Sequence, residues 1–451
     1  MNSNTVNAAI GFLSGLCLMV LIVINPAPAK ALEVRKVTSP GGISAWLSED
    51  HTIPLFAVRF SFKGGSAADP ADKAGLAYFL SGMLDEGAGD MTSADFQKQV
   101  KQLNMRLSFS AEREAFSGSL QTLTVNRDAA FDMLRLALTS PRFDDAPLNR
   151  VRGQIALSLR EDAKDPETIV GSRWMGLMFG DHPYARPIKG SADGLKAITG
   201  ADMKDLVKRL FARDNLLISV VGDIDEATLK RLLDETFGTL PQKSNMPIIP
   251  VPSIKTDPQI AVIERDLPQS AIRFGHIGIK RDDPDFMNAY VMNHILGGGG
   301  FGSRLTDEVR EKRGLSYSVY STFYPLDQGG VFFGGAATVN ERVSETIDVI
   351  REALNKMALD GPTAQELAEA KTYLTGSYAL RFDNSRKIAG QLLGIQRQNL
   401  GIDYVVKRND LVNAVTLEDV RNVAKRIISG DSLVITIVGK PKGVKSDGTS
   451  G

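Results

Sequence analysis

Cysteine and histidine are both scarce in this chain of 451 residues. It contains one cysteine, Cys17, and four histidines, His51, His182, His276 and His294. A single cysteine cannot form an intramolecular disulfide, so we expect hydrophobic cores to hold the fold, which a chain of this length can supply. No two histidines have the spacing that lets a pair of imidazoles bind one metal from the same helix face. The sequence therefore predicts no local metal motif; the alternative is a site assembled from distant positions.

An excess of charge is also absent, with 53 basic and 53 acidic residues. The chain has no basic block interleaved with aromatic residues, which is the pattern typical of nucleic-acid-binding surfaces. We therefore expect no nucleic acid partner.

The first 31 residues have the composition of an export signal. Residues 8–24 are almost wholly apolar, and Ala29-Lys30-Ala31 fits an A-x-A cleavage site. We expect cleavage after Ala31 and a periplasmic mature protein without cysteine. Two alternatives stay open: an uncleaved signal that anchors the chain in the membrane, and lipidation of Cys17, which lies in a near-match to a lipobox. At the other end, residues 441–451 are predicted to form a disordered tail.

An internal duplication organises the rest of the chain. Residues 199–222 and 416–439 align without a gap at an offset of 217. The identical pairs include Thr199/Thr416, Asp202/Asp419, Lys208/Lys425, Arg209/Arg426, Asp214/Asp431 and Gly222/Gly439. A second match, of residues 57–60 with 271–274, has an offset of 214. The shared order and near-constant spacing indicate two copies of one domain.

Each copy contains an amphipathic helix followed by a continuous apolar strand. This pattern predicts an α+β fold of two tandem domains, each a mostly antiparallel sheet packed against helices. We place the domains at residues 32–245 and 259–440. Residues 246–258, which are rich in proline, form the predicted linker.

The segment Gly75–Leu84 predicts a helix with one apolar stripe. The stripe consists of Leu76, Phe79, Leu80, Met83 and Leu84. Asp72 is the predicted N-cap, and Gly87 the predicted end. Tyr78 and Gly82 are four residues apart and so share the opposite face.

This segment resembles the zinc-binding helix of the M16 (pitrilysin or insulinase) family of peptidases, in particular of bacterial members. The family typically reads Gly-Leu-Ala-His-Phe-Leu-Glu-His-Met here, whereas Tyr78 and Gly82 stand at the two histidine positions and Ser81 at the glutamate. The third family ligand falls near Ser158, where Glu161 is the nearest carboxylate. Glycine cannot coordinate a metal, and a serine hydroxyl is too weak a base to activate water. The resemblance implies the M16-type metallohydrolase fold with no zinc on this chain.

A second motif of the family is intact. Residues 305–317, Leu-Thr-Asp-Glu-Val-Arg-Glu-Lys-Arg-Gly-Leu-Ser-Tyr, resemble the family's C-terminal Arg-x6-Tyr pair. By that resemblance, Arg310 binds the substrate backbone and Tyr317 stabilises the oxyanion. The local pattern predicts a helix from Ser303 that Gly314 ends, followed by a strand over residues 316–323. On spacing alone, a helix-terminal arginine and a strand tyrosine would be ordinary structural residues.

A glycine-rich loop precedes this motif. It consists of Gly297, Gly298, Gly299 and Gly300, and no Gly-Lys-Ser/Thr follows it, so it is not a phosphate-binding loop. Either it is a flexible turn or, as the resemblance implies, it lines a chamber near the substrate.

These features predict a non-catalytic subunit of a periplasmic heterodimeric M16 peptidase. A partner would carry His-x-x-Glu-His and zinc, while this chain would close the chamber around an unfolded or short peptide and offer Arg310 and Tyr317 in trans. The main alternative is a peptide-binding or structural pseudopeptidase with no proteolytic partner. A third reading, a zinc endopeptidase in its own right, has no residue set to support it.

Overall fold

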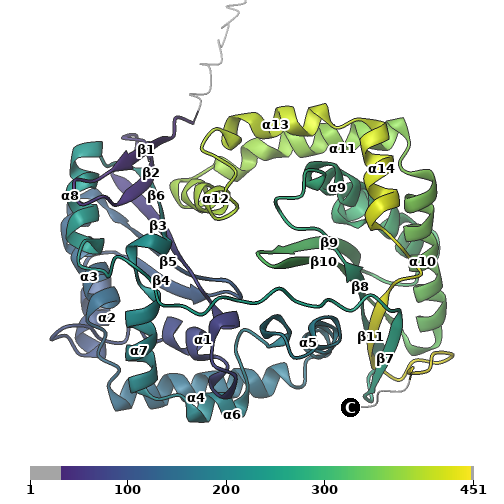
Figure 1. Cartoon of the computed structure of the whole chain (residues 1–451), viewed down its shortest axis with the longest axis horizontal. Coiled ribbons are helices and arrows are strands. Elements are labelled where there is room, and N and C mark those ends of the chain that lie inside the picture. Colours follow the sequence, from purple (N-terminus) through teal and green to yellow (C-terminus); the bar gives the residue numbers. More distant parts are fainter. Residues whose placement is uncertain (1–31, 448–451) are drawn as a thin grey trace, which may run out of the picture. The chain divides into compact units, whose positions relative to one another are not determined.

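The computed structural model describes residues 32–447, so the predicted export signal and Cys17 lie outside the described residues. From Val34 onward these residues form one compact unit built on two β-sheets (Figure 1).

The first sheet belongs to the N-terminal half and has the strand order β1-β2-β6-β3-β5-β4. Its strands are β1 (Arg35–Thr38), β2 (Ser44–Glu49), β3 (Leu55–Lys63), β4 (Arg106–Ala111), β5 (Ala115–Leu123) and β6 (Leu216–Gly222). All neighbouring strands run antiparallel except β2 and β6, which are parallel.

The second sheet belongs to the C-terminal half and has the order β7-β11-β8-β10-β9. Its strands are β7 (Gln259–Glu264), β8 (Gln269–Ile277), β9 (Val319–Leu326), β10 (Gly329–Val339) and β11 (Val434–Gly439). Only β7 and β11 are parallel. Both sheets are thus mostly antiparallel and packed with helices, and the predicted α+β class is confirmed.

Fourteen α-helices complete the described residues. In the N-terminal half they are α1 (Leu76–Ser81), α2 (Ser93–Gln102), α3 (Arg127–Thr139), α4 (Asp145–Asp162), α5 (Pro166–Phe179), α6 (Ala192–Ala197), α7 (Gly200–Leu210) and α8 (Glu226–Phe237). In the C-terminal half they are α9 (Phe286–Asn293), α10 (Val343–Asp360), α11 (Ala364–Gly376), α12 (Ser385–Arg397), α13 (Tyr404–Ala414) and α14 (Leu417–Ile427).

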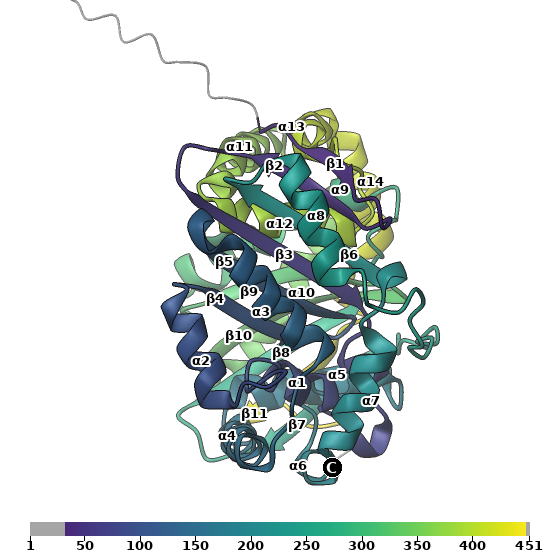
Figure 2. The ribbon, with the colours of Figure 1, turned by 90° about the vertical axis from the view of Figure 1, so that its left-hand side faces the viewer.

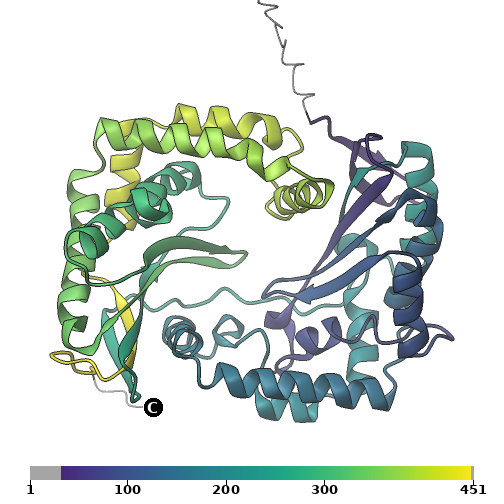
Figure 3. The same cartoon turned by 180° about the vertical axis from the view of Figure 1, so that it is seen from behind.

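One face of each sheet packs on helices of its own half. In the first sheet, Phe56, Val58 and Phe60 alternate along β3 and are buried in a core shared with α3 and α8, and Figure 2 shows these two helices crossing the sheet. In the second sheet, Ile272 and Phe274 of β8 are buried with residues of α10 and α14, and α10 is seen from behind in Figure 3.

The opposite face of each sheet packs on a helix from the other half. Ala57 and Val221 of the first sheet are buried against Ala389 and Leu392 of α12. Ala271 and Val438 of the second sheet are buried with Val170 of α5. The four sheet residues form two pairs at the offsets of the duplication, so the two halves exchange equivalent helices.

Hydrogen bonds reinforce this exchange. Gln396 of α12 donates from Nε2 to the Ser219 hydroxyl at 2.7 Å and to the Ile218 carbonyl at 3.0 Å. Thr436, which aligns with Ser219, donates from its hydroxyl to the Val170 carbonyl of α5 at 2.9 Å. The sequence predicted two domains, each packed on its own helices, whereas the structure shows that each sheet also depends on one helix of the other half.

The aligned segments also form equivalent helix starts. Thr199 accepts from the Asp202 amide, and Asp202 accepts in return from the Thr199 amide at 2.8 Å. Thr416 and Asp419 repeat this arrangement at the start of α14, with an amide bond of 2.9 Å. The duplication inferred from identical residues is therefore visible as two matching capping boxes.

In the segments outside the sheets and helices, one prediction was wrong, namely the extent of the disordered tail. No helix or strand lies between Phe237 and Gln259, the region of the predicted linker. Part of the predicted disordered tail is ordered, because the Asp447 amide donates to the Ile260 carbonyl at 2.9 Å and its carboxylate accepts from the Ile260 amide at 2.8 Å. Residues 448–451 lie outside the described residues. Within residues 32–447, none of the helices combines the length and apolar character needed to cross a membrane.

Candidate functional site

The helix that resembles a zinc-binding helix is shorter than predicted. It spans only the six residues Leu76–Ser81, and its N-cap is Gly75 with φ of 99° rather than Asp72. Asp69 supplies the missing cap from a distance, because its carboxylate accepts from the Gly75 amide at 3.0 Å and the Ala77 amide at 3.1 Å. Burial raises the pKa of this carboxyl to about 7. No sequence pattern had assigned this role to Asp69.

The helix ends at Ser81 and not at Gly87, because Gly82 already adopts the C-cap position. Successive turns follow, in which the amides of Met83 and Glu86 each bond the carbonyl three residues earlier. Gly82 has the weakest tendency to continue a helix apart from proline. An i, i+4 pair of ligands needs an unbroken helix, and here the second ligand position lies beyond the helix.

The three degenerate positions are engaged in local packing. The Ser81 hydroxyl donates to the Tyr78 carbonyl at 2.7 Å, and the Tyr78 ring packs against the first core. A Cβ atom on Gly82 would lie 3.2 Å from Val151 Cγ1 of α4, which leaves little room for an imidazole. These residues offer no nitrogen or carboxylate donor, so they do not fit a zinc ion.

At the position of the third family ligand, near Ser158, the side chains form a hydrogen bond and an ion pair with a lysine. The Ser158 hydroxyl accepts from the Lys189 ammonium at 2.8 Å, and this ammonium pairs with Asp162 at 2.7 Å. Glu161, the nearest carboxylate in the sequence, pairs with Lys164 at 3.0 Å on the exposed side of α4. A lysine cation therefore stands beside the place where the family has a metal ligand, and it would repel Zn²⁺.

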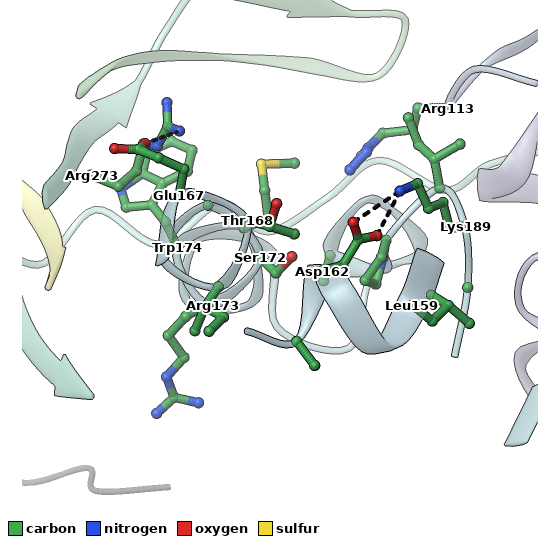
Figure 4. Close-up of a pocket in the computed structure, with 18 of the residues that line it drawn as sticks. Arg113, Leu159, Asp162, Glu167, Thr168, Ser172, Arg173, Trp174, Lys189 and Arg273 are labelled. Carbon is green, nitrogen blue, oxygen red and sulfur yellow. Dashed lines mark hydrogen bonds and ion pairs between the residues drawn. The ribbon is translucent and has the colours of Figure 1, made fainter. Parts of the chain in front are cut away.

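Lys189 lies at the edge of a cavity of about 780 Å³ lined by both halves of the chain. Figure 4 shows Lys189 facing Asp162 with Arg113 beside them, and Arg273 and Glu167 on the opposite side. Arg113 is only 8% exposed and donates to the carbonyls of Tyr184 at 3.3 Å and Arg186 at 3.4 Å. Burial lowers the pKa of Arg113. The cavity wall is thus rich in cations, which the sequence did not indicate.

Arg310 and Tyr317 come together as predicted. The Arg310 guanidinium carbon lies 4.7 Å from the centre of the Tyr317 ring and 4.6 Å from that of Phe301. Phe301 is 75% exposed and Tyr317 82% exposed. A cation between two exposed aromatic rings holds its orientation by cation–π attraction, which leaves N–H groups and the phenol hydroxyl for a ligand. The contribution of Phe301 was not predicted.

The local structure around this pair differs in detail from the prediction. The helix from Arg304 onward becomes a π-helix over Thr306–Glu311, a form that often marks functional segments. The Gly314 amide bonds the Arg310 carbonyl at 2.8 Å, and φ of 58° at Gly314 reverses the chain, as expected for the helix end. The following strand begins at Val319, so Tyr317 lies in the turn and not in the strand.

The glycine segment is more structured than the predicted loop. Gly297 and Gly298 belong to a π-helical turn over His294–Gly298. A Cβ on Gly297 would lie 2.3 Å from the Ser321 hydroxyl, and Gly300 has a positive φ of 61°, so both positions favour glycine. Gly297, Gly298 and Gly300 line a second cavity, of about 1020 Å³, while Gly299 lies between them in the chain.

The four histidines occupy separate environments. His51 bonds Asp223 at 2.6 Å on the surface, and His182 bonds the Pro250 carbonyl at 2.9 Å. His276 is buried and stacks on Phe332, while His294 stacks on Tyr373. Within residues 32–447, no three His, Cys, Asp or Glu side chains are grouped so that they could hold a metal ion.

Comparisons with known proteins agree with this arrangement. The model for "Insulinase (Peptidase family M16)" matches residues 45–192, and that for "Peptidase M16 inactive domain" matches residues 197–374. An uncharacterized zinc protease of Mycobacterium tuberculosis is 27% identical over 417 residues, covering 90% of this chain and 93% of that protein. The non-peptidase homolog YmxG of Helicobacter pylori is 26% identical over 402 residues, covering 87% and 91%.

Solved structures show the same similarity. A peptidase M16 inactive domain from Pseudomonas fluorescens superposes with a TM-score of 0.85 at 28% identity, covering 92% of this chain and 100% of that one. A protease from Helicobacter pylori shares the fold with a TM-score of 0.81 at 19% identity, covering 90% and 99%. With two family models that between them span most of its length, the chain belongs to the M16 (insulinase) peptidase family.

Proposed function

We propose that this chain is the non-catalytic subunit of a periplasmic M16 peptidase made of two different chains. The observation that carries the proposal is an asymmetry between the halves. The first half lacks every zinc-ligating and water-activating side chain of the family motif at Tyr78, Ser81 and Gly82, while the second half presents Arg310 and Tyr317 together on its surface.

In this proposal the two subunits divide the chemistry. The partner carries His-x-x-Glu-His and the zinc ion that activates the attacking water. Arg310 binds carbonyl oxygens of the substrate backbone, and the Tyr317 hydroxyl donates a hydrogen bond to the oxyanion that develops on the scissile carbonyl. Tyr317 is exposed and Arg310 is half-buried, with 27% of its side chain accessible, so both can be reached by a substrate held between two subunits.

The similar proteins support a non-catalytic role without requiring it. The Helicobacter pylori relative is named a non-peptidase homolog, whereas the mycobacterial relatives are named zinc proteases. We propose that the first 31 residues act as an export signal to the periplasm, where the substrate would be an unfolded or short peptide. A peptide-binding pseudopeptidase without a proteolytic partner is the alternative that the following experiment separates.

Co-purification from the native organism tests the proposal. The tagged chain should retain a second M16 chain with an intact His-x-x-Glu-His, and metal analysis should find zinc in the pair but not in this chain alone. Peptide cleavage should require both chains. Stoichiometric zinc on the isolated chain, cleavage by it alone, or retrieval of no such partner under conditions that preserve complexes would refute the proposal.

A further inference from the structure

The second cavity, of about 1020 Å³, lies wholly within the C-terminal half. Residues of α9, β9, α11, α12 and α13 line it together with the glycine segment. Arg310 and Tyr317 are not among its lining residues, although Gly300 and Ser318, which line it, are the chain neighbours of Phe301 and Tyr317.

The cavity is positively charged and has no acidic lining. Arg281, Arg381 and Arg408 line it, and among the described residues neither Asp nor Glu does. None of these three arginines forms a salt bridge within residues 32–447. Three arginines that line one cavity without a carboxylate beside them leave it positively charged, which favours an anion as its occupant.

Arg408 is the most deeply placed of the three, with 4% of its surface exposed. It donates to the Leu374 carbonyl at 2.6 Å, to Asn409 Oδ1 at 3.0 Å and to the Tyr290 hydroxyl at 3.2 Å. Its guanidinium carbon lies 4.7 Å from the Tyr378 ring. These neutral contacts fix the orientation of the cation but do not neutralise its charge, and a buried uncompensated charge is costly.

Arg281 is held in a similar way at the rim. Its Nε donates to Gln398 Oε1 at 2.8 Å and its NH2 to the Tyr404 hydroxyl at 3.3 Å. The guanidinium carbon lies 4.1 Å from the Phe286 ring. Burial lowers the pKa of Arg281, but an arginine remains a cation at neutral pH. Arg281 and Arg408 are therefore pre-positioned donors with aromatic faces around them.

The rest of the lining suits a polypeptide rather than a small anion. A space of this volume is at the upper end of ligand cavities and far exceeds one phosphate. Its wall includes Ser318–Phe323, which contains much of β9, the edge strand of the second sheet. An edge strand offers main-chain hydrogen bonds to an extended chain. His294 stacks on Tyr373, and burial together with the Arg408 charge lowers its pKa, so it adds an uncharged aromatic surface.

We propose that this cavity binds an extended polypeptide segment through its carboxylates, with Arg281, Arg381 and Arg408 as the recognising cations and the surrounding aromatic rings as apolar contacts. The inference rests on the peptide-binding part of the proposed function but needs no catalytic partner. The carboxylate could come from acidic side chains or from a C-terminus, and the choice of peptide distinguishes these sources.

Fluorescence anisotropy of the purified chain with three labelled octapeptides provides the test. The first alternates glutamate with leucine and phenylalanine and is acetylated and amidated; the second replaces each glutamate by glutamine; the third is the glutamine peptide with a free C-terminal carboxylate. The acidic peptide should bind at least about tenfold more tightly than the amidated glutamine peptide, and added salt should weaken it. Equal binding of all three peptides would overturn the proposal. Tight binding of the third peptide would assign the site to a C-terminus, and weak binding to acidic side chains.

A matched pair of double variants locates the site. Arg281→Gln/Arg381→Gln removes two cavity cations, while Lys387→Gln/Lys407→Gln removes two exposed cations of α12 and α13 that pair with Asp383 and Asp403. The first variant should lose at least about tenfold in affinity and the second less than about twofold, since contact charges act at short range. Equal losses would show that binding follows net charge and not this cavity.

Thermal unfolding of both double variants checks that a loss of affinity does not come from a loss of stability. If the cavity double variant is destabilised, the single variants Arg381→Gln and Arg381→Lys replace it, because Arg381 is exposed. Lysine should then restore part of the affinity that glutamine loses, and no difference between them would count against the proposal. Because the assay contains no partner, its failure leaves the heterodimer unaffected, and absence of a partner leaves this cavity unaffected.

Discussion

Tyr317→Phe separates a catalytic role of the Tyr317 hydroxyl from a structural one. The substitution keeps the aromatic ring, and with it the 4.7 Å contact with the Arg310 guanidinium. It removes only the hydroxyl, which makes no hydrogen bond to any residue between 32 and 447. Since Tyr317 is 82% exposed, no buried partner is left unsatisfied.

The structure therefore predicts a small effect of this substitution on stability and a large effect on turnover. The free energy of unfolding should change by less than about 0.5 kcal/mol, as is typical of an exposed side chain without buried contacts. A hydrogen bond to a developing oxyanion contributes about 3 kcal/mol to barrier lowering, so turnover should fall roughly a hundredfold. If Tyr317 has a structural role alone, turnover should stay unchanged.

The assay uses this chain reconstituted with its zinc-bearing partner and a quenched fluorescent unfolded peptide. Turnover is measured at saturating substrate, and complex formation is checked by size-exclusion chromatography. Tyr324→Phe, the same chemical change within β9, serves as the matched control. Unchanged turnover of the Tyr317→Phe complex, or an equal loss in the control, would show that the hydroxyl plays no part in catalysis.

Two further predictions concern stability. Burial raises the pKa of Asp69 to about 7 from 3.8. Between these two pH values the native state therefore holds a proton that the unfolded chain releases. The free energy of unfolding should consequently fall by up to about 4 kcal/mol as pH rises from about 4 to 8. Urea unfolding at pH 5 and 8 should show a smaller decline for Asp69→Asn, and an identical decline would contradict the assignment. Thr199→Ala and Thr416→Ala should each cost about 1 kcal/mol, because each removes one of two equivalent caps; thermal unfolding should show similar losses.

The elements that sequence reasoning predicted are those with local causes. Thr199 and Asp202 recur as Thr416 and Asp419, and a capping box needs only residues three apart in the chain, so both helix starts could be predicted. The Arg310–Tyr317 pair was singled out through its resemblance to a family motif, and a single turn at Gly314 brings the two residues together. In each case the spacing along the chain determines the contact.

The features that the sequence did not reveal depend on distant contacts. The cap of α1 comes from Asp69 through a loop, so the nearer Asp72 was the wrong choice. The exchange of α5 and α12 joins Val170 to Thr436, and no local pattern encodes which sheet a helix covers. Arg281 and Arg408 are far apart in the sequence and line the same cavity only in the folded C-terminal half. Isolated arginines carry no periodic signal, so the sequence alone offered no indication of this cluster.

The residues packed around Gly82 and Ser158 also differ from what a zinc site would need. Gly82 lies against Val151, so a histidine at this position would require α4 to move or repack. Ser158 bonds Lys189, whose ammonium also pairs with Asp162, so restoring two histidines and a glutamate would place a metal site beside a fixed cation. The packing around Gly82 and Ser158 thus does not fit the zinc site of the family, while α5 of the first half packs on the sheet of the second half. Without α5, the second sheet would lose the contacts of Val170 with Ala271, Val438 and Thr436, and this sheet belongs to the half that carries Arg310.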